Sequence, residues 1–251
     1  MGVIMCKIGI QLYSVHKEIA QRGFDEMLGV VKEAGFNCVE FAGFYGHTPE
    51  EVVALCKKHD LAPVSAHIGV KEMEESLPYI DALGIKKVYI PWVAYEDLAD
   101  NFDELVKEIK RVKVWLDERG VELGYHNHAQ EYRDGGDKFY DLLCAIDGFT
   151  AEPDIFWVKA GGHEPLEILE KYGDKVTAVH VKELDKRWKE GENPRDYPCA
   201  IVGEGQSDSR NAMAYAKSKG IDLFVLEVEG FPCAVEECLK KSCDNMKQFL
   251  K

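Results

Sequence analysis

The sequence has few positive charges for its length. Its 251 residues include 31 Lys and Arg against 45 Asp and Glu, which gives a formal net charge of −14. Nucleic acids and anionic membrane surfaces bind proteins through clustered cations. The charge balance therefore argues against both as partners and favours a small molecule as the ligand.

Long apolar stretches are also missing. No run of about 18 apolar residues occurs, as a membrane-spanning helix would require. The first seven residues, Met-Gly-Val-Ile-Met-Cys-Lys, lack a basic segment followed by a long apolar one, so we expect no signal peptide. Together these absences predict a cytoplasmic protein without a membrane segment.

The eight cysteines form no Cys-x-x-Cys pair, the spacing typical of zinc and redox sites. The last three, Cys233, Cys238 and Cys243, recur every five residues along a predicted helix and therefore do not share a face. Most others lie in apolar strand or helix contexts, where Cys behaves as a small hydrophobe. We expect reduced thiols, in keeping with a cytoplasmic location.

The chain instead shows a regular alternation of strand and helix patterns. Apolar, β-rich runs predict strands at 7–13, 37–41, 61–67, 86–90, 121–127, 154–158, 176–182 and 223–229. Helical periodicity predicts helices at 24–34, 49–59, 72–83, 98–119, 138–146, 165–172, 209–219 and 234–250. Thr48 is placed to cap the second of these helices.

Eight strand–helix pairs in about 250 residues are the pattern of a (β/α)8 barrel. We therefore predict an α/β fold with a single TIM-barrel domain over residues 1–251. A doubly wound open sheet is the alternative, but no Gly-x-Gly-x-x-Gly follows the first strand, and eight units are many for such a sheet. The long link 183–208 follows the seventh strand, where a barrel carries its chemistry, and suits a lid or substrate loop.

The segment 124–132, Gly-Tyr-His-Asn-His-Ala-Gln-Glu-Tyr, places two imidazoles, an amide and a carboxylate at the end of the fifth predicted strand. In a barrel the carboxyl ends of all strands meet at one mouth, and the other strand ends are polar too. They carry Gln11, Glu40, His67, Asp154, Trp157, His180, Lys182, Glu227 and Glu229. Polar groups facing a barrel axis are costly unless they bind something, so their convergence predicts a divalent-metal site. One Mn²⁺, Mg²⁺, Co²⁺ or Zn²⁺ ion would suit this mixture of oxygen and nitrogen ligands.

Five motifs follow one another in an order that resembles a known family. They are residues 124–132, Asp154-x-x-Trp157 with Ala-Gly-Gly-His-Glu-Pro at 160–165, His-Val-Lys-Glu at 180–183, Val-Gly-Glu-Gly at 202–205 and Leu-Glu-Val-Glu at 226–229. The chain resembles xylose isomerase-like TIM-barrel sugar phosphate isomerases/epimerases over essentially its whole length. Members hold a divalent metal through a Glu, an Asp, a His and a second Glu from successive later strands. Carried over, this implies Glu131, Asp154, His180 and Glu227. Relatives often place the first Glu inside strand five itself, so His126 or His128 is the alternative to Glu131.

Such a site can remove a proton next to a carbonyl. A metal that chelates the carbonyl and the neighbouring hydroxyl stabilises the enediolate that proton loss creates. We take Glu131 and Glu227 as the two candidate bases and Lys182 as the group that steadies an oxyanion. The expected substrate-binding residues are His67, His126, His128, Trp157 and Glu229, with Trp188 as a second wall beside Trp157. Return of the proton to the other face gives an epimer, return to the adjacent carbon gives an isomer, and loss of a β-hydroxyl gives dehydration.

We therefore predict a metal-dependent sugar or sugar-phosphate isomerase or epimerase, with a dehydratase of a keto-sugar or keto-inositol as the alternative. Two further classes share the barrel. A metal-dependent nuclease needs a basic face for DNA, which the acidic composition argues against. A non-catalytic carbohydrate-binding barrel would have lost the carboxylates that this chain keeps. The sequence leaves open which sugar or cyclitol is used, whether it is phosphorylated, and whether the protein is a homo-oligomer.

Overall fold

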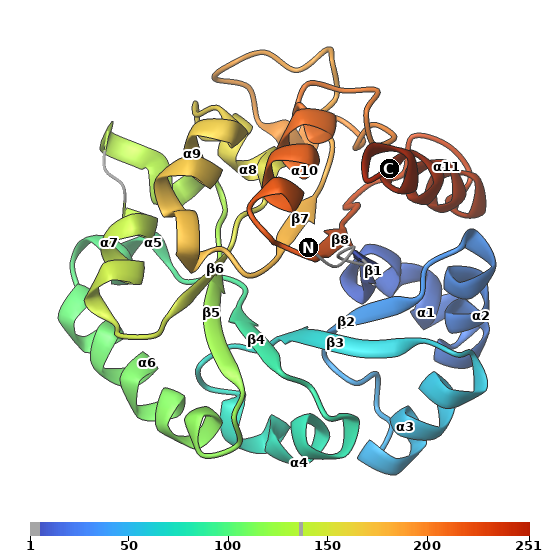
Figure 1. The fold of residues 1–251 in the computed structure, drawn as a ribbon, viewed down its shortest axis with the longest axis horizontal. Coiled ribbons are helices and arrows are strands. Elements are labelled where there is room, and N and C mark those ends of the chain that lie inside the picture. Colours follow the sequence, from blue (N-terminus) through green and yellow to red (C-terminus); the bar gives the residue numbers. More distant parts are fainter. Residues whose placement is uncertain (1–5, 136–137) are drawn as a thin grey trace.

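Eight parallel strands form a nearly closed barrel in the computed structural model, which describes residues 6–135 and 138–251 (Figure 1). Continuous ladders join the strands in the order β6-β5-β4-β3-β2-β1-β8-β7. The strands are β1 (Lys7–Gln11), β2 (Cys38–Ala42), β3 (Ala62–His67), β4 (Lys87–Ile90), β5 (Glu122–His126), β6 (Thr150–Glu152), β7 (Val179–Val181) and β8 (Leu223–Leu226). The predicted (β/α)8 barrel is confirmed.

The join between β6 and β7, which we call the β6–β7 seam, has no continuous ladder. Two isolated parallel bridges cross it, one between Ala151 and Val176 and one between Asp154 and His180. The backbone N–H of His180 donates to the carbonyl of Pro153 at 3.0 Å. The barrel is therefore closed at this seam by single contacts that include two of the predicted metal ligands.

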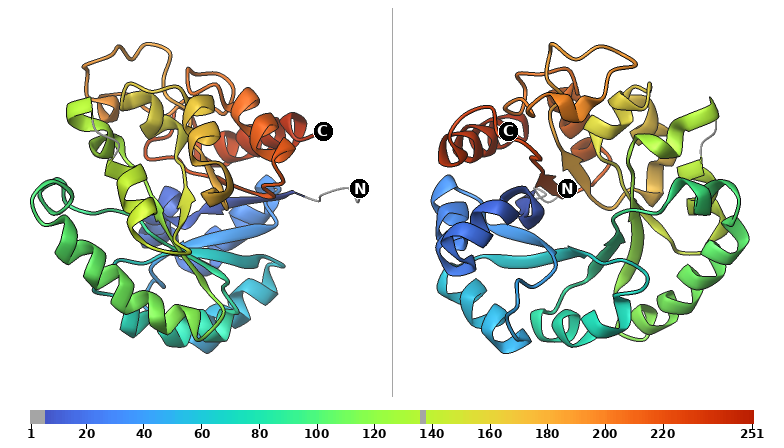
Figure 2. Two further views of the ribbon diagram at one scale, coloured as in Figure 1. Left: turned by 60° about the vertical axis from the view of Figure 1, so that its left-hand side comes forward. Right: turned by 180° about the vertical axis from the view of Figure 1, so that it is seen from behind.

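Helices surround the ring of strands (Figures 1 and 2). The α-helices are α1 (His16–Arg22), α2 (Phe24–Ala34), α3 (Pro49–Lys58), α4 (Met73–Leu83), α5 (Tyr95–Ala99), α6 (Phe102–Asp117), α7 (Lys138–Ala145), α8 (Ile155–Ala160), α9 (Pro165–Tyr172), α10 (Ser209–Ser218) and α11 (Val235–Phe249). Short 3-10 helices are η1 (Leu12–Val15), η2 (Ala129–Gly135), η3 (Gly173–Lys175) and η4 (Pro194–Asp196). Thr48 caps α3 as expected, because its hydroxyl accepts from the N–H of Glu51 while the Glu51 carboxylate accepts from the N–H of Thr48.

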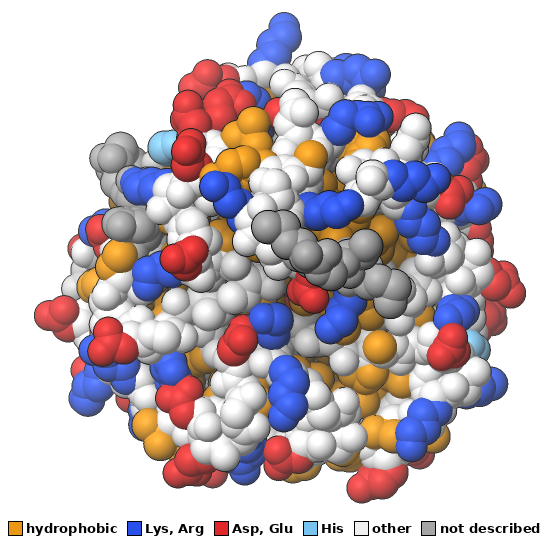
Figure 3. Space-filling view, in the orientation of Figure 1, with side chains coloured by type: hydrophobic (Ala, Val, Ile, Leu, Met, Phe, Trp, Pro, Cys, Tyr) orange, Lys and Arg blue, Asp and Glu red, His pale blue; other side chains and the backbone are white. Residues whose placement is uncertain are grey.

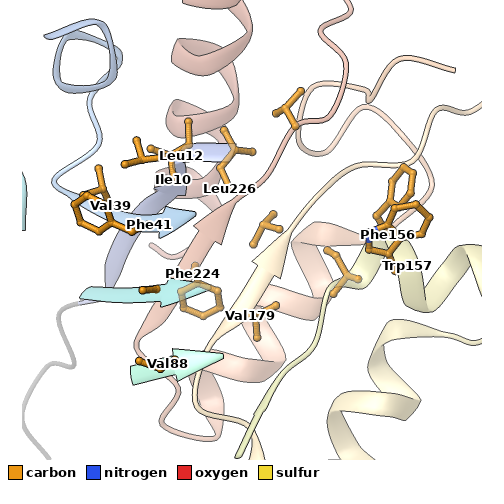
Figure 4. Packing of buried hydrophobic residues seen from close by; sticks show 14 of the residues in the cluster. Ile10, Leu12, Val39, Phe41, Val88, Phe156, Trp157, Val179, Phe224 and Leu226 are labelled. Atoms are coloured by element: carbon orange, nitrogen blue, oxygen red, sulfur yellow. The ribbon is translucent and has the colours of Figure 1, made fainter. Parts of the chain in front are cut away.

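The two faces of each strand pack into different cores. Outward-facing side chains such as Ile10, Phe41 and Leu226 join the main hydrophobic cluster with the helices (Figure 4). The opposite face carries a separate small cluster of Cys38, Tyr89, Ala178, Leu223 and Val225. Because side chains of a strand alternate between faces, this second cluster fills the lower part of the barrel interior.

The same two-residue period turns the interior from apolar to polar toward the carboxyl ends. Along β2 the inner face passes from Cys38 to Glu40, which is fully buried. Along β7 it passes from Ala178 to His180, and beyond β8 it passes from Val225 to Glu227. The strands therefore deliver their polar residues to one inner layer at the carboxyl-terminal mouth.

The sixth strand lies earlier than the sequence pattern predicts. The expected strand at 154–158 is wrong, because β6 covers Thr150–Glu152 and Ile155–Ala160 forms helix α8. The Asp154 carboxylate caps this helix by accepting from the N–H groups of Phe156 and Trp157 at 2.8 and 3.1 Å. The first four residues of α8 are apolar and buried, so their pattern cannot be told from that of a buried strand. The predicted helix at 98–119 is likewise divided into α5 and α6.

Among the described residues, no helix is both long and apolar enough to cross a membrane. Basic and acidic side chains are interspersed over the face shown in Figure 3. All eight cysteines are free. The expectation that no signal peptide is present rests mostly on residues 1–5, which lie outside the described residues.

Candidate active site

A layer of buried polar side chains covers the carboxyl end of the barrel interior. It consists of Gln11, Glu40, His67, His126, Glu152, Asp154, His180 and Glu227. The members come from β1, β2, β3, β5, β6, β7 and the residues that directly follow β6 and β8. Buried charged groups need partners, so a layer this rich in carboxylates and imidazoles indicates a binding site.

One group in this layer can hold a metal ion. His126, Asp154, His180 and Glu227 each offer a ligand atom, and these atoms lie within 4.8 Å of one another. His180 Nδ1 lies 2.9 Å from Glu227 Oε2 and 4.0 Å from Asp154 Oδ2. Asp154 uses only Oδ1 to cap α8, and its buried Oδ2 has no hydrogen-bond partner. An unpartnered carboxylate oxygen between two imidazoles is a fitting ligand for a divalent transition metal.

A second group shares two residues with the first. His67, His126, Glu152 and His180 also offer ligand atoms within 4.8 Å of one another. Glu40 lies against this group, with its Oε1 2.6 Å from His180 Nε2 and 3.1 Å from His67 Nε2. Gln11 donates to the same Glu40 oxygen at 2.8 Å. His180 thus has Glu227 at one ring nitrogen and Glu40 at the other, an arrangement that fixes the orientation of a metal-binding imidazole.

The carboxylates control the protonation of these imidazoles. Burial would lower the pKa of His67 and His180, but the Glu40 charge and the carboxylate hydrogen bonds raise it to about 9 and about 10. Burial and the neighbouring imidazoles instead hold the pKa of His126 well below its usual value, so His126 is neutral. A metal binds neutral imidazole, so loading the site would displace the proton of His180.

Lys182 and Glu229 extend the site toward its entrance. Lys182 is fully buried, with its Nζ 3.1 Å from Glu227 Oε1 and 2.5 Å from Glu229 Oε1. Burial opposes the Lys182 charge, but Glu227 and the other nearby carboxylates outweigh it and raise the lysine pKa. Lysine therefore stays charged and holds the pKa of Glu227 well below its usual range.

A cavity of about 640 Å³ opens above this layer. It is lined by Tyr13, Ala42, His67, Pro91, Trp92, His126, His128, Arg195, Glu227 and Glu229. Tyr13 and Trp92 are 47% and 55% exposed, which is high for large aromatic side chains. Aromatic walls over a floor of titratable groups form a suitable pocket for a small polar molecule with an apolar face.

Comparison with known proteins is consistent with this geometry. A family model described as "xylose isomerase-like TIM barrel" matches residues 28–249. The chain belongs to the xylose isomerase-like TIM-barrel family. A curated relative in this comparison, the inosose dehydratase of Geobacillus kaustophilus, is 24% identical over 190 residues, which cover 64% of this chain and 62% of the relative. The match thus spans less than two thirds of the relative's length.

Solved structures share the fold at lower identity. A sugar phosphate isomerase/epimerase from Parabacteroides distasonis matches with a TM-score of 0.75 and 20% identity, covering 98% of this chain and 96% of that one. A probable 3-DHS dehydratase from Bacillus anthracis matches with a TM-score of 0.76 and 13% identity over 96% and 98% of the chains. A D-allulose 3-epimerase from Methylomonas gives 0.75 and 12%, with 98% of each chain covered. Proteins named as isomerases or epimerases and as a probable dehydratase thus share this fold.

The structure does not bring Glu131 together with the other expected metal ligands. Glu131 Oε1 accepts from the Tyr125 hydroxyl at 2.6 Å, and Oε2 accepts from the His128 N–H at 2.8 Å. Inside strand five no Glu would fit at Gly124, because a Cβ there would lie 2.8 Å from the Tyr89 ring. The strand-five position beside Asp154 is taken by His126, the alternative that the sequence left open.

Glu131 instead gives the protein a dependence on pH. Burial raises the pKa of this carboxyl to about 7, against the hydrogen bonds that lower it. The folded state therefore binds this proton more tightly than the unfolded state. The stabilisation is complete below the unfolded pKa of about 4.5 and is lost as the pH rises through about 7.

Replacing Glu131 by Gln should flatten this dependence. We expect the free energy of unfolding of the parent to fall relative to that of Glu131→Gln between pH 4.5 and pH 8, by up to about 3 kcal/mol. Urea unfolding of both proteins at pH 5 and pH 8 measures the difference. Equal pH profiles for the two proteins would contradict the expectation.

Several residues of the site carry no role in the sequence-based interpretation. Glu152 is absent from it because the sixth strand was placed too late, although its spacing of two from Asp154 puts both on one strand face. The sequence pattern identifies Glu40 only as a polar residue at the end of a strand. Tyr13 and Arg195 line the cavity from the 3-10 helices η1 and η4, and Trp92 lines it from the segment after β4. The sequence pattern gives these three residues no role. Trp157 and Trp188, expected as walls, are buried and do not line it.

Proposed function

We propose that the protein is a divalent-metal-dependent enzyme that removes a proton next to the carbonyl of a keto-sugar or keto-cyclitol and forms an epimer or isomer. The observation that carries the proposal is the convergence of His126, Asp154, His180 and Glu227 beneath the cavity. Related folds among isomerases, epimerases and dehydratases support this class of chemistry.

The four converging residues would hold the ion, with His126 in the place that the resemblance gave to Glu131. Their mixture of two imidazoles and two carboxylates suits Mn²⁺, Co²⁺ or Zn²⁺ better than Mg²⁺, which prefers oxygen ligands. When bound, the ion supplies a Lewis acid beside the substrate carbonyl. Glu40 would orient His180 from behind through the 2.6 Å contact with Nε2.

Glu227 is our candidate for the base. It lines the cavity, and its neighbours Lys182 and His180 keep it ionised, so it can accept a proton at neutral pH. Lys182 is fully buried, so we assign it to holding Glu227 in place and charged rather than to contacting the substrate.

His67 is our candidate for the group that returns the proton. It lines the same cavity from β3, three strands around the barrel from Glu227 beside β8. With a pKa near 9 its ring is protonated at neutral pH. Because Nε2 is held by Glu152 at 2.7 Å, Nδ1 is the atom free to donate to a substrate. A base and an acid on different sides of one cavity can invert a carbon centre.

Dehydration is the second candidate. The protonated His67 in the cavity lining is the observation that favours it. The same protonated imidazole could donate to a departing β-hydroxyl after Glu227 has taken the proton. The inosose dehydratase relative points in the same direction.

The mass of the product separates the two candidates. The manganese-loaded protein is incubated in deuterated water with a panel of ketoses and keto-cyclitols. We expect the product of its substrate to carry one solvent deuterium at carbon. A product of unchanged composition with one deuterium supports epimerisation or isomerisation, and a product lighter by one water supports dehydration. Formation of an epimer or isomer without solvent deuterium at carbon contradicts the proposed proton exchange next to the carbonyl.

A further inference from the structure

Lys182 and Arg195, near the cavity, are paired with the same carboxylate. Glu229 Oε1 lies 2.5 Å from Lys182 Nζ, and Glu229 Oε2 lies 3.1 Å from Arg195 Nε. Arg195 is the one arginine or lysine among the described residues that line the cavity. Its guanidinium also lies 4.5 Å from the centre of the Trp157 ring. Glu229 thus neutralises the positive charge that a bound anion would need.

The charge of the surrounding layer points the same way. Glu40, Glu152, Asp154, Glu227 and Glu229 provide carboxylates. The side-chain cations in contact with them are Lys182, Arg195, His67 and His180. Each of these cations already has at least one carboxylate partner. A phosphate monoester carries nearly two negative charges and is held by unpaired Arg or Lys side chains or by backbone N–H groups. The described cavity lining offers no unpaired cation.

The walls suit an uncharged substrate instead. Tyr13 and Trp92 expose large aromatic surfaces at the cavity, and Tyr13 stacks on His16 at a ring separation of 4.3 Å. Exposed aromatic faces bind the C–H face of a sugar or cyclitol ring, and the imidazoles and carboxylates below can bind its hydroxyls.

We propose that Glu229 is a specificity-determining residue that makes the cavity select an unphosphorylated keto-sugar or keto-cyclitol over its phosphorylated counterpart. This inference rests on the proposed function for the kind of substrate. The exclusion of anions is argued only from the ion pairs that Glu229 makes with Lys182 and Arg195. Neutralising Glu229 would release Arg195 to bind a phosphate group while Lys182 keeps its contact with Glu227.

Matched pairs of substrates test the proposal on the manganese-loaded parent. D-Fructose and D-tagatose are compared with their 6-phosphates by the rate of solvent-deuterium incorporation. We expect the unphosphorylated member to have the higher kcat/KM by at least about 10-fold, with little change between about 20 and about 300 mM salt. Preference for the phosphorylated member would overturn the proposal, even if Glu229 variants fail to fold.

The variants Glu229→Gln and Glu190→Gln provide the matched comparison. Both remove one negative charge, but Glu190 is an exposed residue of the same loop that makes none of these contacts. We expect Glu229→Gln to reduce the preference by about 10-fold and Glu190→Gln to leave it unchanged. Equal effects of the two variants would overturn the role of Glu229.

Binding of inorganic phosphate separates this proposal from the proposed function. Calorimetric titration of the manganese-loaded proteins should show binding to Glu229→Gln about 10-fold tighter than to the parent or to Glu190→Gln. If no ketose exchanges deuterium but this difference is found, the proposed reaction fails and the anion exclusion stands. If phosphate binds the three proteins equally, the anion exclusion fails whatever the reaction is.

Discussion

Asp154→Asn is expected to weaken binding of a divalent ion by at least about 100-fold. The asparagine oxygen can still cap α8, as Asp154 Oδ1 does for Phe156 and Trp157. Its amide nitrogen, however, takes the place of the unpartnered Oδ2 and presents N–H donors to the ion. The variant therefore removes a ligand while it keeps the local fold.

Metal content and thermal unfolding measure this loss. At an ion concentration of about 100 times the parent Kd, binding stabilises the parent by about 2.7 kcal/mol, so the parent Tm should rise by roughly 5–10 °C. Asp154→Asn should show little rise. Glu131→Gln is the matched control, because Glu131 is an equally buried carboxylate outside both metal-binding groups. Metal loss in the control but not in Asp154→Asn would show that Glu131 is the ligand after all.

Glu227→Gln is expected to lower kcat by about 1,000-fold while it lowers substrate affinity much less. The amide keeps the size of the side chain but cannot take up the proton. Incorporation of solvent deuterium should fall in parallel with product formation. Because Glu227 is also a proposed ligand, metal content is determined on the same samples, and kcat is compared at full metal loading.

His67→Gln distinguishes the return of the proton from its removal. The glutamine amide can still donate to Glu152, as His67 Nε2 does at 2.7 Å. We expect product formation to fall by about 100-fold while deuterium continues to enter the unreacted substrate. Parallel loss of both signals in His67→Gln would assign His67 to binding or to proton removal instead.

The alternation of strand faces made most of this site predictable. His180 and Glu227 follow apolar residues at a spacing of two, and a parallel barrel gathers such positions at one mouth. The pattern cannot say how far along its strand each residue sits relative to a neighbour. That relative height depends on register and interior packing. Here Thr150 and Tyr89, which pair with Gly124 on the neighbouring strands, occupy the space that a side chain at Gly124 would need, and His126 is the strand-five residue at the layer.

The sequence could not predict which loop residues reach the cavity or which residues orient the candidate ligands, and the reason is different. Trp92 and Arg195 reach the cavity through the paths of irregular segments, which long-range contacts determine. The role of Glu40 depends on its contact with His180, which is 140 residues away in the chain. A single sequence carries periodicity along the chain but no direct record of which distant residues meet.

At the β6–β7 seam, the candidate metal site would connect the two ends of the sheet that forms the barrel. Asp154 and His180 face each other across the join where no continuous ladder runs. An ion held by both would tie the first six strands to the last two at their weakest connection. Loading and unloading would therefore change the rigidity of the ring itself as well as its chemistry, and the seam is where an unloaded barrel would open first.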